Sequence, residues 1–175
     1  MKKTYLQKEL KKLKVPKNKF FYPLNHDNLR NKDLSEGIKV IFSRQLTMSN
    51  MTRKFEDTFK KKLNLKYSLM VNSGSSANLL ALQCLINPYR EKRLKSGDEV
   101  LVPAICWSTS LWPIIQSGLK PVFVDVDRDT FNISLKDLKS KINKKTKALM
   151  LVHVLGNSVN MEKLNTIIKK NKIIL

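Results

Sequence analysis

The sequence predicts an α/β fold, in which a mostly parallel sheet carries helices on both faces. From residue 67 onward, short apolar runs alternate with segments in which apolar residues recur at helical spacing. Strands that alternate with helices of about ten residues are typical of a parallel sheet. Largely apolar runs such as 148–155 are typical of strands buried on both faces of such a sheet.

The N-terminal part of the chain precedes this pattern and is organised differently. Residues 1–19 form a basic tail that holds eight lysines and one acid, and three leucines give it a helical spacing. An aromatic patch at 20–22 opens the next segment, 20–66, in which the periodicity predicts helices over about 28–43 and over 51–63. The third segment, 67–175, is the predicted α/β domain.

Each element of the α/β domain has a local signal. The apolar run 67–71 leads into a Gly-Ser turn, which predicts a strand followed by a helix from Ala77. Ser134 is a favourable N-cap for the helix after it. The other expected elements are strands at 99–102, 121–124 and 148–155, helices at 108–116, 135–142 and 161–170, and a new strand from Ile173.

The last three residues, Ile173 to Leu175, are typical of a central strand that has just begun. A domain rarely ends there, because the following helix would be missing. We therefore expect this chain to be the N-terminal portion of a longer protein, and a short edge strand is the alternative interpretation.

The charge is strongly positive, with 34 Lys and Arg against 14 Asp and Glu and a net charge of +20. Lysines outnumber arginines 28 to 6, whereas phosphate and base recognition favours the guanidinium fork. No zinc-finger spacing and no aromatic RNA-binding motif is present. Specific nucleic-acid binding is therefore not expected, but a non-catalytic basic module that binds polyanions remains an alternative function.

The sequence also indicates a compartment. It has no apolar stretch of about 20 residues that would cross a membrane, and its lysine-rich start does not resemble a secretory signal. The two cysteines, Cys84 and Cys106, have neither CxxC nor metal-ligand spacing. These features predict a cytoplasmic protein with free thiols and no membrane partner.

The strongest chemical signal is the segment 72–78, Asn-Ser-Gly-Ser-Ser-Ala-Asn. A strand followed by a Gly-Ser turn and a helix presents free backbone N–H groups that bind phosphate. Gly74 allows close approach, and Ser75 and Ser76 add hydroxyls. A plain serine N-cap without a ligand is the other interpretation. The segment is neither a P-loop nor a dinucleotide fingerprint, because the required lysine and glycine spacings are absent.

A second signal is Trp107, which follows the strand 99–102 at the edge where open α/β sheets bind ligands. Its indole either lies on an aromatic ligand or packs in the core, whereas Trp112, further along the helix, is expected in the core. His153, near the end of the predicted buried strand, either faces a ligand or is a hydrogen-bonded core histidine.

Other reactive side chains carry weaker arguments. Cys106 lacks a partner base in the sequence and is interpreted as a buried thiol rather than a nucleophile. Asp125, Asp127 and Asp129 alternate after a strand without metal-loop spacing. We therefore expect turn and surface residues there, with Asp125 closing the strand, and no metal site.

Several motifs occur together in one order and spacing, and they lie at 71–78, 97–103, 118–127, 131–133, 145–148 and 152–156. They resemble the DegT/DnrJ/StrS-type enzymes, which use pyridoxal 5′-phosphate (PLP) to modify nucleotide-linked keto sugars. The resemblance runs from about residue 44 to the end of the chain.

The resemblance implies an aspartate-aminotransferase-like (fold type I) architecture with the site at a homodimer interface. It implies PLP as the cofactor, in its pyridoxamine 5′-phosphate form, and glutamate as the amino donor. Gly74, Ser75 and Ser76 would hold the phosphate, Trp107 would stack on the pyridine ring, and His153 completes the expected cofactor-binding set. The chemistry would be transamination or 3-dehydration, and Trp107, where many aminotransferases have Phe or Tyr, slightly favours the 3-dehydratase branch.

The family's catalytic residues are not in this chain. The acid that pairs with the pyridine nitrogen follows the strand that begins at Ile173. The Schiff-base lysine, a histidine in the dehydratases, comes later still. No lysine of this chain has the matching context, so we expect the 175-residue chain to be inactive alone.

Overall fold

The computed structural model describes Lys12 and residues 28–175, which divide into two compact units between Ser68 and Leu69. The helix expected within 1–19 and the aromatic patch at 20–22 lie outside the described residues. No helix in the described part of the chain is long and apolar enough to cross a bilayer.

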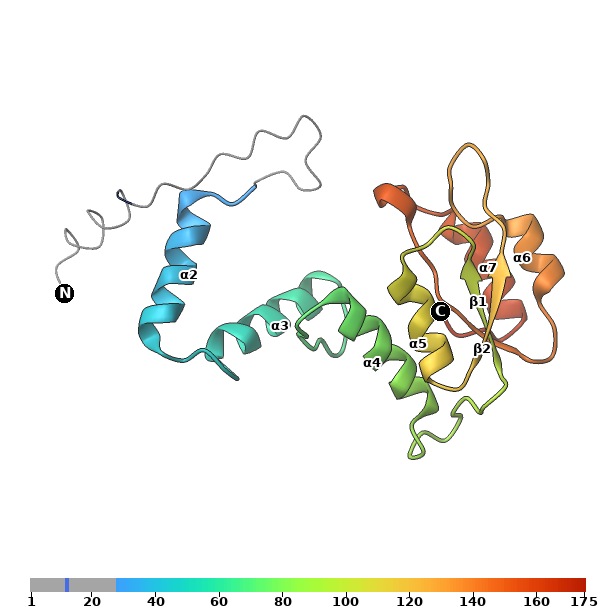
Figure 1. Ribbon diagram of the computed structural model, residues 1–175, viewed down its shortest axis with the longest axis horizontal. Helices are drawn as coiled ribbons and strands as arrows, with labels where there is room; N and C mark the ends of the chain where they lie inside the picture. The colour runs from blue at the N-terminus through green and yellow to red at the C-terminus, as the bar shows by residue number, and fades with distance from the viewer. Residues whose placement is uncertain (1–11, 13–27) are drawn as a thin grey trace. The chain divides into compact units, whose positions relative to one another are not determined.

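Over residues 28–68 the first unit forms the helices α2 (Asn31–Ser43) and α3 (Asn50–Lys62), close to the predicted ranges (Figure 1). The Ser49 hydroxyl caps α3 by accepting a hydrogen bond from the backbone of Met51. Phe55 and Phe59, one turn apart, stack with ring centroids 5.6 Å apart. Neither helix buries a residue, so no buried core is present among residues 28–68.

The second unit is built on a parallel sheet of β1 (Glu99–Pro103), β2 (Lys120–Val124) and β3 (Thr146–Leu149) in the order β2-β1-β3. Every residue of the central strand β1 is buried. Leu101, at its middle, pairs with Val122 on one side and Leu149 on the other. Continuous burial of this kind is what the uninterrupted apolar runs predicted.

Helices cover both faces of the sheet, as predicted. The first face packs against α4 (Gly74–Ile86) and α5 (Ser108–Gln116) through Val100 and Val102. The second packs against α6 (Leu135–Lys141) and α7 (Met161–Lys170) through Leu101, and Figure 1 shows α5 and α6 on opposite sides of the sheet. Side chains of β1 alternate between the two cores, because successive residues of a strand point to opposite faces.

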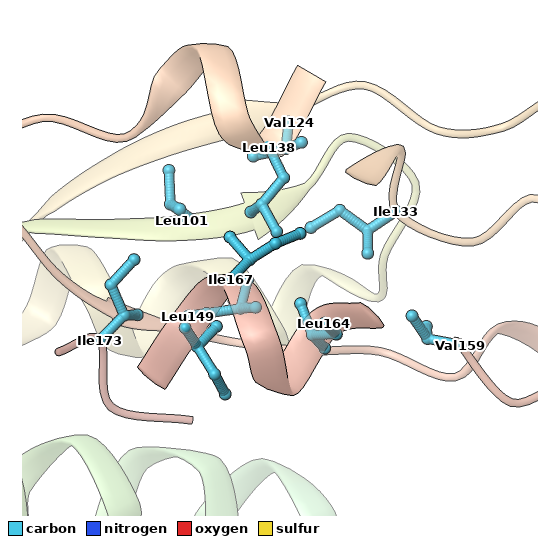
Figure 2. Close-up of a cluster of buried hydrophobic side chains, with 10 residues drawn as sticks. Leu101, Val124, Ile133, Leu138, Leu149, Val159, Leu164, Ile167 and Ile173 are labelled. Atoms are coloured by element: carbon cyan, nitrogen blue, oxygen red, sulfur yellow. The ribbon is translucent and has the colours of Figure 1, made fainter. Parts of the chain in front are cut away.

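The larger core lies between the sheet and the helices α6 and α7, and Figure 2 shows its side chains converging from both layers. Its members come from strands, helices and the connecting loops, which ties the whole unit together. The buried members are Leu101, Val124, Ile133, Leu138, Leu149, Val159, Leu164, Ile167, Ile168 and Ile173.

The strand expected at 67–71 is absent, so that prediction is wrong. These residues have no regular structure, and Tyr67 and Leu69 are exposed. An extended segment becomes a strand only when a neighbour takes up its backbone hydrogen bonds, and no described strand pairs with this one. The following helix begins at Gly74, three residues before the expected Ala77.

The strand expected at 148–155 is wrong from Met150 onward. β3 runs only from Thr146 to Leu149, and a 3-10 helix occupies Val154–Gly156. The register of β1 with β3 ends at Leu101, whereas its pairing with β2 continues to Pro103. Ala104 N–H then donates to the Val124 carbonyl on the β2 side. Residues beyond Met150 therefore have no strand beside them.

At the expected strand from Ile173, the chain forms a single β-bridge with β3, on the side of β3 opposite β1. Ile174 N–H donates to the Lys147 carbonyl at 2.9 Å, and Leu149 N–H donates to the Ile174 carbonyl at 2.8 Å. The pairing with Ala148 is parallel. A strand that continued this pairing would be a fourth parallel strand, next to β3.

Candidate functional site

The first turn of α4 leaves donors free. The Ser73 hydroxyl caps the helix by accepting a hydrogen bond from Ser76 N–H at 3.1 Å, and the Ser73 carbonyl accepts one from Ala77 N–H. The backbone N–H groups of Gly74 and Ser75 and the Ser75 hydroxyl have no partner among the described residues. Free N–H groups at a helix N-terminus attract anions.

Gly74 is not explained by the fold. Its φ lies outside the left-handed region, and a Cβ added to it would meet nothing within 4 Å. Glycine in a helix costs about 0.5–1 kcal/mol relative to alanine, so neither the backbone nor the packing of this unit favours it. What glycine provides here is open space beside the free N–H groups.

A cleft of about 280 Å³ joins the start of α4 to α5. Ser75 and Ser76 line it from α4, and Thr109 and Trp112 line it from α5. The other lining residues are Leu79, Pro113 and Gln116. Two serines whose hydroxyls and backbone could hold a phosphate therefore share a cleft with an aromatic ring.

The two helices are joined at this cleft by a hydrogen bond that sequence reasoning missed. Pro113 lacks an N–H group, so it cannot donate to the Thr109 carbonyl one turn earlier. Asn78 of α4 donates its side-chain N–H to that carbonyl at 3.1 Å. Pro113 inside an expected helix was the available signal, because the carbonyl that it frees must find another donor.

The two tryptophans are placed differently from each other. Trp112 is 54% exposed and lines the cleft, so its expected place in the core is wrong. The buried face of α5 consists of Ser110, Pro113 and Ile114, and Trp112 lies on the other side of the helix. Trp107 immediately precedes α5 as its N-cap residue and is 75% exposed.

The structure thus brings together part of the predicted set. Ser75 and Ser76 line the cleft, whereas Gly74, Trp107 and His153 do not. Gly74 does not line the cleft, but it is the residue directly before Ser75, which does. Trp107 lies two residues before Thr109, which Asn78 holds against α4.

His153 is exposed, and the expectation of a buried strand at this residue is wrong. It precedes the 3-10 helix, and its Nδ1 accepts a hydrogen bond from Val159 N–H at 3.2 Å. The buried Asn132 holds the same loop, because its side chain donates to the Asn157 carbonyl and accepts from Val154 N–H. Asn132 belongs to the motif at 131–133. Its hydrogen bonds to Val154 and Asn157 join residues 22 and 25 positions apart, so local sequence did not predict them.

The aspartates after β2 are turn residues, as expected. One Asp127 carboxylate oxygen accepts hydrogen bonds from the backbones of Asp129 and Thr130. Asp125 N–H donates to the Asp137 carboxylate at 2.8 Å, which lowers the pKa of Asp137 and joins the end of β2 to α6. Within the described residues, no three acidic, histidine or cysteine side chains are grouped to hold a metal.

Cys106 is expected to react more slowly than Cys84 with iodoacetamide near neutral pH. Burial raises the pKa of the half-buried Cys106 thiol, so little of the nucleophilic thiolate is present. Cys84 is exposed. Alkylation followed by peptide mass spectrometry measures both rates, and faster labelling of Cys106 would contradict this prediction.

The model of the DegT/DnrJ/EryC1/StrS aminotransferase family matches residues 27–175. GDP-4-keto-6-deoxy-D-mannose 3-dehydratase of Escherichia coli O55:H7 is 40% identical over 154 residues, which are 88% of this chain and 39% of that protein. GDP-perosamine synthase of Escherichia coli O157:H7 is 35% identical over 124 residues, which are 71% of this chain and 32% of that protein.

Among solved structures, a GDP-4-keto-6-deoxymannose 3-dehydratase with a trapped PLP-glutamate geminal diamine is similar to this chain. The TM-score is 0.82 at 39% identity, over 88% of this chain and 40% of that one. The chain therefore spans about two fifths of the length of these 3-dehydratases. The similarity supports the fold type I architecture that the motifs implied.

Proposed function

Because the chain belongs to the DegT/DnrJ/EryC1/StrS aminotransferase family, we propose that the enzyme containing it uses PLP to modify a nucleotide-linked keto sugar. The observation that carries this proposal is the open turn at the start of α4, with free N–H groups and a glycine that the fold does not require. PLP, when bound, supplies a pyridine ring that withdraws electrons from the substrate.

The residues of this chain would bind and orient the cofactor. The N–H groups of Gly74 and Ser75 and the hydroxyls of Ser75 and Ser76 would receive the phosphate at the positive end of α4. Trp107 would cover one face of the pyridine ring and exclude water from it. Asn78 would keep the start of α5 at the distance from α4 that this arrangement needs.

We further propose 3-dehydration rather than transamination as the reaction. Identity to the E. coli 3-dehydratase is 40% over 154 residues, against 35% over 124 residues for GDP-perosamine synthase. Trp107, in place of the Phe or Tyr of many aminotransferases, favours the same branch. The proposal includes glutamate as the amino donor, a homodimer and a cytoplasmic location.

The cofactor site is tested with pyridoxamine 5′-phosphate, which has no aldehyde and so cannot form imines with the 28 lysines of the chain. A phosphate at a helix N-terminus and one stacked ring give weak binding, with a dissociation constant of about 1 mM. Saturable quenching of tryptophan fluorescence measures this binding. Inorganic phosphate is expected to reverse the quenching.

Variants that keep only one tryptophan show whether the cofactor ring lies against Trp107, as proposed, or against Trp112 in the cleft. The chain has only two, so Trp107→Phe and Trp112→Phe each leave a single emitter. We expect saturable quenching in Trp112→Phe and its loss in Trp107→Phe. Quenching that follows Trp112 instead would place the ring within the cleft between α4 and α5 and would reject Trp107 as the stacking residue.

A further inference from the structure

A groove of about 800 Å³ lies between α6 and α7, on the face of the sheet opposite α4 and α5. It shares no lining residue with the cleft between those two helices, and the proposed function does not use it. The lining residues are Leu135, Lys136, Lys139, Ile142, Lys163, Thr166, Ile167, Lys170 and Asn171.

The groove is bordered by positive charge from both helices. Lys136 and Lys139 contribute from α6, and Lys163 and Lys170 from α7. All four are exposed, and none forms an ion pair with a described residue. No acidic residue lines the groove. Four ammonium groups around one depression repel one another, and a partner that supplies carboxylates would relieve this repulsion.

The remaining lining is largely apolar. Leu135, Ile142 and Ile167 contribute hydrocarbon to the groove, and Thr166 is its one hydroxyl. Aromatic rings and arginines are absent from the lining, and these are the groups on which nucleic-acid bases stack and which grip phosphates. The groove therefore suits an occupant with one apolar side and carboxylates beside it.

We propose that the α6–α7 groove docks an acidic amphipathic helix of another protein. Lys163 and Lys170 are seven residues apart, which is two helical turns or about 10.5 Å. Carboxylates seven residues apart on a partner helix have the same spacing. The apolar stripe of that helix covers the partly exposed Leu135 and Ile142, beneath which the buried Ile167 forms the floor of the groove, as in other complexes in which an amphipathic helix binds a groove.

The probe is a synthetic peptide in which leucine and glutamate recur at helical spacing on opposite faces. Its binding to the full chain is measured by fluorescence anisotropy, and the site is mapped by amide NMR shifts. We expect shifts confined to 135–142 and 163–171, and affinity that falls as salt is added. A peptide that keeps the glutamates and replaces the leucines with serine is expected to bind at least about tenfold more weakly.

Charge reversal tests the lysines. The double variant Lys163→Glu/Lys170→Glu is expected to weaken peptide binding about tenfold or more. Lys92→Glu/Lys95→Glu, with the same change in net charge at lysines outside the groove, should stay within about twofold, as expected for screened charges remote from the site. Circular dichroism and thermal unfolding verify that each variant is folded.

Three outcomes would overturn the proposal. One is equal weakening by both double variants, which would show attraction by net charge alone. Another is equal binding by the peptide without leucines. The third is displacement of the peptide from the groove by duplex DNA or by phosphatidylglycerol vesicles at lower concentration than the unlabelled peptide, which would assign the surface to a nucleic acid or a membrane.

Discussion

Replacing Leu101 with alanine is expected to lower the free energy of unfolding by about 3 kcal/mol. Leu101 is fully buried at the centre of β1, with a neighbouring strand on each side and the helices α6 and α7 over its side chain. Truncating a buried leucine costs about 2–5 kcal/mol, because transfer energy is lost and a cavity remains. Whole domains are stable by only about 5–15 kcal/mol.

Urea unfolding followed by circular dichroism measures this loss. The helices α2 and α3 bury no residue, so the cooperative transition reports the second unit. Leu155→Ala is the matched control, because it removes the same atoms from a side chain that is 96% exposed. It should change the stability by less than about 0.5 kcal/mol. Equal losses in the two variants would mean that Leu101 is not in a packed core.

The sequence was sufficient for the elements with local signals. The expected helices 108–116 and 161–170 agree with α5 and α7 at both ends. Ser134 caps α6 by accepting a hydrogen bond from Asp137 N–H, as predicted. Periodicity and capping act within a few residues, so they can be identified without knowing what lies across the fold.

Strands were harder, because a strand is defined by its neighbour. The segments 67–71 and 151–153 are largely apolar, as β1 is, yet neither segment pairs with a described strand. Hydrophobicity alone cannot distinguish these cases. The errors at His153 and at 67–71 therefore have one cause, which is pairing that depends on distant residues.

The site divides in the same way. The free donors in the first turn of α4, on which the proposed phosphate site rests, could be predicted from local sequence, because helix N-terminal geometry is a local property. That Asn78 contacts Thr109, 31 residues away, is a tertiary fact. Trp112 was expected in the core because large aromatic residues are usually buried. It is exposed because it lines the cleft, and the residue type alone does not indicate this.

Replacing Gly74 with alanine is expected to weaken binding of pyridoxamine 5′-phosphate about tenfold, or about 1.4 kcal/mol. The added Cβ would meet no protein atom within 4 Å, so it would not disturb the packing of the protein, but it would occupy space in which the proposed site holds the phosphate. Hydrogen bonds to a charged group contribute about 1.5–3 kcal/mol, and displacing the anion would lose part of this. Amide shifts of Ser75 and Ser76 during an NMR titration measure the binding.

Gly37→Ala is the control, because Gly37 is also a helical glycine with nothing within 4 Å of an added Cβ. Alanine is the better helix former, so neither variant should lose stability. A loss of binding in Gly74→Ala without a loss of stability would assign the cost to the ligand alone. Unchanged binding in Gly74→Ala would mean that no anion approaches this turn, and Gly74 would then be a helix residue without a role in cofactor binding.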